Sequence, residues 1–270
     1  MKLTVLMDNN TIIDDYYLGE PAVCYFIEDG GKRILFDMGY SGAFLKNAEA
    51  MGIDLQQLDA AVFSHGHNDH TGGLPDYLEF RKSRRPLEVV AHPDCFDKKR
   101  IGGTPICSPL THLQAALRCS LLLTREPAAL TPRLTFLGEI PEYTAFEGRH
   151  QIGEREQAGA FVPDFLPDDS ALCYRSEQGL CIITGCSHAG ICNIIEHARR
   201  VCRDERIYAV LGGLHLFEVD ERLHRTAAFL KQAGIQRFYP CHCTSFAAKA
   251  ELHREIPVTE VGVGFSVEWI

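Results

Sequence analysis

An apolar strand that leads into a ligand-rich turn constrains the fold of this chain more than any other feature. The apolar run at residues 60–63 enters the turn directly, and glycines at residues 72 and 73 end it. Imidazole nitrogen and carboxylate oxygen are ligands that Zn²⁺ and Fe²⁺ accept. The spacing H-x-H-x-D-H predicts two metal positions at the end of one strand. His65 and His67 can converge on one ion, and Asp69 and His70 on a second.

Composition limits the class of protein and its partners. The chain has 270 residues, of which 46% are hydrophobic and 23% charged, as in ordinary globular proteins. A net charge of −9 argues against nucleic acid as the main partner, since phosphate binding needs a basic face. The absence of a long apolar stretch predicts no membrane span, and early polar residues argue against a signal peptide. We expect a cytoplasmic protein with a small-molecule substrate, and the sequence leaves the oligomeric state open.

Eleven cysteines are an unusually high number for such a chain. Several lie in apolar runs, and a disulfide framework is typical of small secreted chains. We therefore expect most of them to be small buried side chains in a reducing compartment. Cys186, Cys241 and Cys243 differ because each adjoins a candidate metal ligand.

The remaining pattern alternates strands and helices at both ends of the chain and suits two sheets packed face to face with helices outside. We expect a single domain over residues 1–270, with an irregular insertion at about 93–167 that lies over the mouth of the site. The expected strands are 3–8, 22–28, 33–37, 60–63, 87–91, 171–175, 180–184, 207–211, 237–239 and 261–268. The expected helices are 41–52, 113–117, 191–202, 221–232 and 245–252.

Several motifs resemble one known family. The H-x-H-x-D-H segment, the Gly-Cys-Ser-His run at 185–188 and the Pro-Cys-His-Cys-Thr run at 240–244 are similar to the metallo-β-lactamase superfamily. They resemble in particular the branch named for 7,8-dihydropterin-6-methyl-4-(ribofuranosyl)aminobenzene-5'-phosphate synthase (dihydropteroate-synthase-like). The resemblance implies an α+β fold, a four-layer αβ/βα sandwich of two mixed sheets with helices outside. It also implies metals at the edge between the sheets.

Further ligands follow from this resemblance. His188 and His242 lie just after expected strands and match ligand positions of the superfamily. Many superfamily hydrolases carry a bridging Asp in a Gly-Asp pair where this chain has Gly185-Cys186. The Cys186 thiolate could bind a metal, since cysteine is a ligand for Zn²⁺. Alternatively Cys186 binds no metal and His188 completes the coordination. We favour His188 as the ligand and keep Cys186 as a further candidate.

Two residues are candidates for the chemistry itself. Asp69 is expected to bind metal and to orient an attacking hydroxide. His215, in the run Gly-Gly-Leu-His-Leu, matches no primary ligand of the superfamily, and we expect it to contact the substrate or to act as a general acid. Asp8, Asn9 and Asp37 are expected to brace the ligand histidines. His92 fits either the mouth of the site or a structural position.

Three functions fit these observations. The leading one is a metal-dependent hydrolase that uses one or two ions on a small phosphate- or carboxylate-bearing substrate. Zn²⁺ is the expected ion, with Fe²⁺ and Mn²⁺ as alternatives. The branch name implies instead a transferase or synthase that acts on a dihydropterin and a ribofuranosyl-aminobenzene phosphate, although fold does not fix reaction. The third is a non-catalytic metal or ligand sensor.

Overall fold

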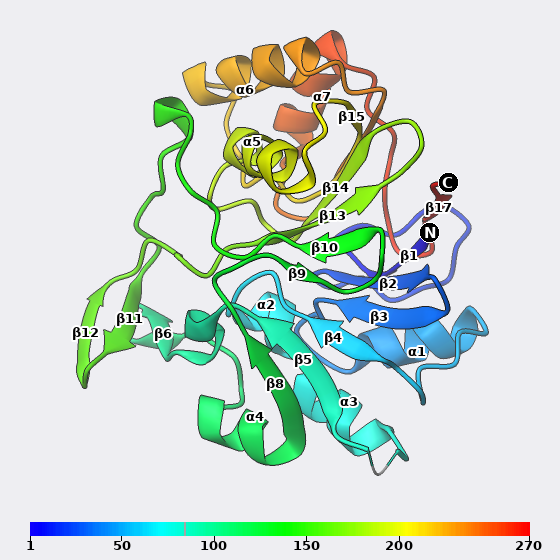
Figure 1. Cartoon of the computed structure of the whole chain (residues 1–270), viewed down its shortest axis with the longest axis vertical. Helices are drawn as coiled ribbons and strands as arrows, with labels where there is room; N and C mark the ends of the chain where they lie inside the picture. The colour runs from blue at the N-terminus through cyan, green and yellow to red at the C-terminus, as the bar shows by residue number, and fades with distance from the viewer. Residues whose placement is uncertain (84) are drawn as a thin grey trace.

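The computed structural model describes residues 1–83 and 85–270 (Figure 1). A first sheet contains, in order across the sheet, β17 (Ser266–Glu268), β1 (Lys2–Met7), β2 (Cys24–Asp29), β3 (Lys32–Phe36), β4 (Ala60–Val62), β5 (Leu87–Ala91) and β8 (Cys119–Leu123). A second contains β16 (Arg237–Pro240), β15 (Ile207–Gly212), β14 (Leu180–Thr184), β13 (Ala171–Arg175), β10 (Leu134–Phe136) and β9 (Ala128–Ala129). A small third sheet contains β12 (Ala160–Pro163), β11 (Glu154–Gln157), β6 (Lys99–Ile101) and β7 (Thr104–Pro105).

The two large sheets are mixed and carry helices on their outer faces. The strands from β3 to β8 run parallel in the first sheet, and β14, β15 and β16 run parallel in the second. The other pairs in these sheets are antiparallel. The α-helices are α1 (Ala43–Ala50), α2 (Asn68–Thr71), α3 (Leu74–Phe80), α4 (His112–Arg118), α5 (Ile191–Cys202), α6 (Glu221–Gln232) and α7 (Phe246–Glu255). Short 3₁₀ turns occur at Pro93–Phe96 and Ala145–Glu147.

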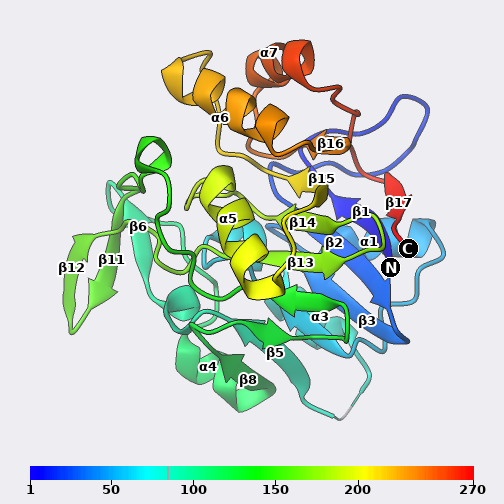
Figure 2. The ribbon, with the colours of Figure 1, turned by 45° about the horizontal axis from the view of Figure 1, so that its top comes forward.

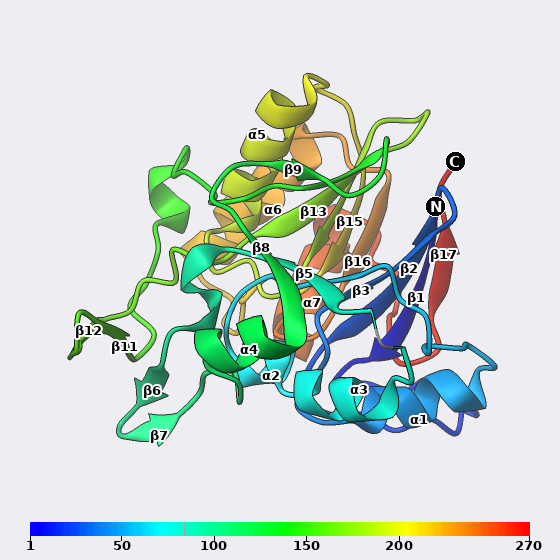
Figure 3. The same ribbon diagram turned by 60° about the horizontal axis from the view of Figure 1, so that its bottom comes forward.

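Three apolar cores lie between four layers. Helices α1, α3 and α4 pack on the first sheet, and α5, α6 and α7 pack on the second. The third core lies between the sheets, which face each other in Figure 3. Alternation along β14 explains this arrangement, because Ile182 points to the helices and Ile183 to the other sheet. The four-layer αβ/βα sandwich of two mixed sheets is therefore confirmed, and Figure 2 shows α5, α6 and α7 on one side of it.

The segment at 93–167 differs from the irregular insertion that the sequence predicted. It supplies β8 to the first sheet, β9 and β10 to the second, and the whole third sheet. The third sheet projects from one side of the sandwich (Figure 1). Its strands are two to four residues long, and β11 pairs with β6 across more than fifty residues of sequence. Such short strands leave little periodicity in the sequence.

The chain ends meet at the edge of the first sheet, where β1 pairs with β17 (Figure 1). The closing strand covers only Ser266–Glu268, because the segment before it loops past the start of the chain and bridges Thr11 through Val263. Among the helices of residues 1–83 and 85–270, none combines the length and apolar character needed to cross a bilayer.

Candidate metal centre

Loops at the ends of central strands bring the predicted ligands together. The turn after β4 carries His65 and His67, and α2 carries Asp69 and His70. From the second sheet, the loop after β14 carries Cys186 and His188, and the loop after β16 carries His242. The side chains form two groups, and within each group the ligand atoms lie within 4.8 Å of one another.

The first group consists of His65, His67 and His188. Nε2 of His65 lies 3.2 Å from Nε2 of His188. Nε2 of His67 and Nδ1 of His188 are buried without a hydrogen-bond partner. Buried polar atoms are normally partnered, so the free Nε2 of His67, beside the facing Nε2 atoms of His65 and His188, fits an ion held between the three rings.

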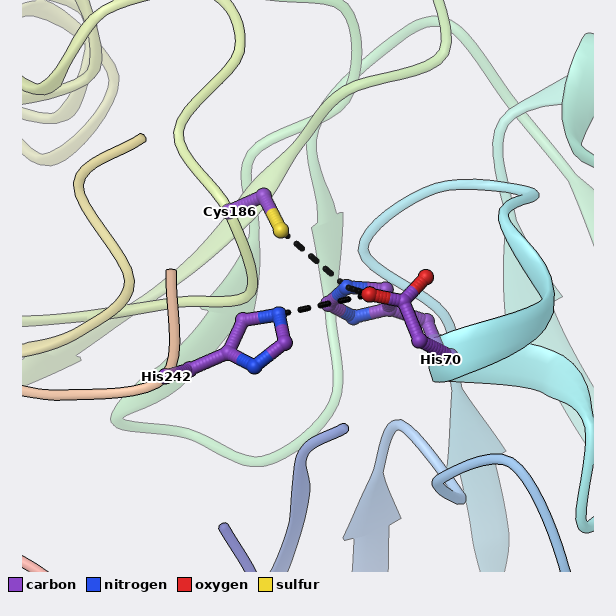
Figure 4. Close-up of side chains that lie close together, drawn as sticks. His70, Cys186 and His242 are labelled. Atoms are coloured by element: carbon purple, nitrogen blue, oxygen red, sulfur yellow. Dashed lines mark hydrogen bonds and ion pairs between the residues drawn. The ribbon is translucent and has the colours of Figure 1, made fainter. Parts of the chain in front are cut away.

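The second group consists of Asp69, His70, Cys186 and His242 (Figure 4). Oδ2 of Asp69 lies 3.4 Å from Nε2 of both His70 and His242, and Sγ of Cys186 lies 3.1 Å from Nε2 of His70. Nε2 of His242 has no hydrogen-bond partner. Cys186 and His188 thus belong to different groups, so neither takes the other's position.

Hydrogen bonds on the outer side of the rings fix their orientation. Nδ1 of His70 lies 2.7 Å from Oδ2 of Asp37, and Nδ1 of His242 lies 2.9 Å from Oδ1 of Asn9. The backbone N–H of His242 donates to Asp8 over 3.1 Å. Contacts of this kind set the tautomer of a ligand histidine and aim its other nitrogen at the metal.

The backbone of these loops is strained and tightly packed. Asp37, Ser187, His215 and His242 all have a positive φ, between 49° and 60°, which is uncommon for residues other than glycine. A Cβ at Gly185 would come within 2.2 Å of Oγ of Ser64. The Gly-Cys pair therefore lets the β14 loop approach the β4 turn closely. Strain of this kind clusters at functional sites.

Burial keeps the first group of imidazoles in the neutral form that binds metals. Burial and the neighbouring histidines hold the pKa of His65 and of His188 well below its usual range, and burial lowers the pKa of His67 to about 4. In the second group, burial opposes ionisation of Asp69, but the adjacent His70 and His242 outweigh it and hold the pKa of that carboxyl well below its ordinary value. Burial raises the pKa of the Cys186 thiol, an effect that a bound cation would oppose.

A buried ion pair anchors the turn between the first two histidines. The backbone N–H of Gly66 donates to Oδ2 of Asp168 over 2.8 Å. Nζ of Lys99 lies 2.8 Å from Oδ1 of Asp168 and 3.0 Å from Asp164, and all three side chains are fully buried. Lys99 and Asp168 were not predicted from the sequence, because they are 69 residues apart and meet only in the folded chain. A Pro-Asp-Asp run at 167–169 shortly before a strand is a weak signal of a functional loop.

The two ligand groups open into a cavity of about 810 Å³. His67, Asp69, Cys186, His188 and His242 line it. His215 lines it as well and contacts His188, with a distance of 4.4 Å between ring centroids. Burial and the nearby Arg222 lower the pKa of His215 to about 4, so its imidazole is neutral near pH 7. A neutral imidazole can donate a hydrogen bond to a substrate or accept a proton, and it is a weak source of protons.

Three further candidate residues differ in whether they line the cavity. Cys243 lines the cavity, where its Sγ accepts the backbone N–H of His215, whereas Cys241 is buried with its Sγ 3.2 Å from the hydroxyl of Tyr25. His92 is buried and does not line the cavity; its Nε2 lies 3.2 Å from Glu139. Of the two expected positions, the mouth of the site and a structural one, His92 therefore occupies the structural one.

The donor set fits transition metals. Imidazole nitrogens make up the first group and half of the second, which a carboxylate and a thiol complete. Zn²⁺ and Fe²⁺ accept these ligands, whereas Mg²⁺ and Ca²⁺ favour oxygen. The partnerless Nε2 atoms of His67 and His242, and the facing Nε2 atoms of His65 and His188, would become ligand atoms in such a site.

Fold and donor set together define a class of proteins in which a four-layer sandwich presents metal-ligand side chains at the edge of its sheets. The chain belongs to the metallo-β-lactamase superfamily, whose family model matches residues 18–201. It is 33% identical over 237 residues to 7,8-dihydropterin-6-methyl-4-(β-D-ribofuranosyl)-aminobenzene-5'-phosphate synthase of Methanocaldococcus jannaschii, covering 83% of this chain and 80% of the relative.

Solved structures agree with this assignment. A metal-dependent hydrolase of the β-lactamase superfamily superposes with a TM-score of 0.84 at 26% identity, covering 99% of this chain and 98% of that one. Zn²⁺-bound PqqB from Methylobacterium extorquens shares the fold, with a TM-score of 0.57 at 13% identity over 99% of this chain and the whole of the other.

Proposed function

We propose that the chain is a metal-dependent enzyme that holds one or two transition-metal ions, most simply Zn²⁺, and hydrolyses a small substrate bearing phosphate or carboxylate. The observation that carries the proposal is the convergence of two groups of ligand atoms on one cavity. His65, His67 and His188 would hold one ion. Asp69, His70 and His242 would hold the other, with Cys186 as a further ligand.

The side chains of the cavity have distinct roles in this proposal. Bound ions would supply Lewis-acid polarisation and lower the pKa of a water molecule. Asp69 would accept a hydrogen bond from the attacking water and orient it. His215 would donate a hydrogen bond to an anionic oxygen of the substrate. The buried Asp37 and the exposed Asn9 would keep two ligand rings in place during turnover.

A synthase is the second candidate, and the M. jannaschii relative favours it. That relative is named as the synthase of a single compound that combines a dihydropterin with a ribofuranosyl-aminobenzene phosphate, and identity of 33% extends over most of both chains. The Gly185-Cys186 pair, where many hydrolases of the superfamily carry Gly-Asp, also supports a reaction other than ordinary hydrolysis. In this reading the same metals would position an anionic substrate.

Metal analysis and a substrate panel test these proposals. We expect purified protein, or protein reconstituted with Zn²⁺, Mn²⁺ or Fe²⁺, to hold roughly one to two ions, from the ligand count. Protein that stays metal-free after reconstitution with all three would contradict the proposal. Turnover of phosphoesters or lactones supports the hydrolase. Transfer of a dihydropterin-6-methyl group, from a donor that carries a leaving group on that carbon, to ribofuranosyl-aminobenzene phosphate, with release of the leaving group and a proton and without such hydrolysis, supports the synthase.

A further inference from the structure

The cavity continues beyond the ligand groups into an apolar part beside the start of α7. Phe217 and Phe246 line this part and are 51% and 88% exposed. Ile101 of β6 lines the cavity too and is 50% exposed. Single exposed apolar side chains are ordinary, but several gathered around one hollow are typical of a ligand-binding groove.

Hydrogen bonds between two loops hold together the backbone segments that carry the aromatic side chains. Ser245 donates its backbone N–H to the carbonyl of Leu216 over 2.9 Å and its hydroxyl to the carbonyl of Phe217 over 2.8 Å. Ser245 directly precedes Phe246 and caps α7. The two phenylalanines are therefore held on neighbouring segments before any ligand binds, which lowers the entropic cost of binding.

Lys249 adds a positive charge one helical turn beyond Phe246. It lines the same cavity, is half-buried, and shares a face of α7 with Phe246. Within residues 1–83 and 85–270, the lysines that form ion pairs are Lys32, Lys98, Lys99 and Lys231, and Lys249 is not among them.

Other described lysines, such as the exposed Lys46, also lack an ion pair, but Lys249 lines the cavity. The chain has a net charge of −9, and Glu260 lines the same cavity, yet the two side chains form no ion pair in the described structure. A partly desolvated ammonium gains from an anionic partner. A ligand in the cavity can supply one.

We propose that Lys249, Phe246 and Phe217 form a subsite for the part of the substrate that lies away from the reacting bond, and that this part is a planar ring with an anionic group. The inference rests on the proposed function, because the other end of the same substrate must reach the metal ligands. Phosphate and carboxylate share the chemistry required of the anion. The phenylalanines contact the ring, and the ammonium pairs with the charge.

Binding of 1-naphthalenesulfonate to the zinc-loaded protein tests this subsite. The probe combines a ring with an anion, and because sulfonate is a weak ligand for transition metals, its affinity reports the subsite and not the ions. We expect Lys249→Met to weaken binding roughly 10-fold and Phe246→Ala about 5-fold, from typical energies of charged hydrogen bonds and aromatic contacts. Lys46→Met, an exposed lysine of α1 outside the cavity, is the matched control and should bind like the wild type.

Two simpler probes separate the ring from the charge. Neutral 1-naphthalenemethanol should lose affinity in Phe246→Ala and keep it in Lys249→Met, whereas methanesulfonate should show the reverse. Equal affinity of 1-naphthalenesulfonate for wild type and Lys249→Met, or no binding to either, would overturn the inference. So would a Phe246→Ala variant that loses self-association while it keeps probe affinity, because the phenylalanine would then belong to an interface between copies.

Metal content measured on the same samples distinguishes the two proposals. Lys249-dependent probe binding in protein that cannot retain metal would leave the subsite standing and contradict the proposed function. Metal-loaded, active protein that binds the probe equally well with and without Lys249 would contradict the subsite and leave the proposed function standing.

Discussion

Asp69 has contacts that bear directly on the proposed chemistry. Its Oδ2 lies 3.4 Å from a nitrogen of His70 and of His242, and it lines the cavity. We predict that Asp69→Asn abolishes nearly all turnover with the fold retained, because the amide keeps the size and removes the charge. Activity and circular dichroism of the reconstituted variant check this, with Asp76→Asn as an exposed control. An Asp69→Asn variant at the wild-type rate would show the proposed role to be wrong.

Cys186, His188 and His215 can be separated because they occupy different places. His188→Ala should lower metal content through the first group, and Cys186→Ser should weaken the second group, which retains Asp69, His70 and His242. His215→Ala should keep its metal and lose turnover, since His215 contacts the ring of His188 and lies outside both groups. Metal content and rate are measured on all three. Full occupancy in His188→Ala would remove it from the ligand set.

Strand β6 contributes one buried lysine, Lys99, which supports the turn that carries His65 and His67. We predict that Lys99→Met destabilises the protein by about 3–5 kcal/mol, because it leaves the buried Asp168 without its cation and Asp164 with only Arg155, at 3.9 Å. It should also weaken metal binding, since Asp168 holds the backbone of Gly66. The adjacent Lys98 pairs with Glu156 at the surface, and Lys98→Met should cost far less stability, because exposed ion pairs contribute little. Urea unfolding of both variants compares them, and equal losses would argue against the anchoring role.

The start of α5 depends on a buried carboxylate from the 3₁₀ turn at Ala145–Glu147. Glu147 accepts the backbone N–H of Cys192 over 2.7 Å and the hydroxyl of Thr226 over 3.0 Å. Burial raises its pKa from the usual 4.5. The native state then binds this proton more tightly than the unfolded state, so the stabilising contribution is present below pH 4.5 and is lost as the pH rises through the raised pKa.

We therefore predict that Glu147→Gln becomes more stable relative to the wild type as the pH rises from about 4.5 toward 7. The amide can keep both contacts, because its oxygen accepts from Cys192 and its nitrogen donates to Thr226. Free energies of unfolding at several pH values check the trend. Glu49→Gln, an exposed position on α1, is the control. A constant difference between wild type and Glu147→Gln across this range would rule out the effect.

At the scale of the whole molecule, the local sequence pattern predicts the strands and helices of the four layers. The third sheet instead depends on pairing between distant segments. Four elements were predicted with the observed bounds, namely the strands at 171–175 and 180–184 and the helices at 191–202 and 221–232. Each has a clear run or spacing of apolar residues that is typical of its type of element. The third sheet was missed, since its strands are short and pair across distant segments. Within the candidate site, the clustered motifs indicated the ligand residues. Lys99 and Asp168 lie 69 residues apart and meet only in the folded chain.

The arrangement of the candidate ligands would make a bound metal ion a link between the two halves of the sandwich. His65 and His67 come from the first sheet and His188 from the second, and the second group is divided in the same way. Ions bound in this way stabilise only the native state, by about 4 kcal/mol when free metal is 1,000 times Kd. We predict that chelation lowers Tm and that Zn²⁺ restores it. His188→Ala should show a smaller restoration than His112→Ala, which changes an exposed histidine of α4. A Tm that changes with neither chelator nor Zn²⁺ would mean that no metal bound by these side chains joins the two sheets.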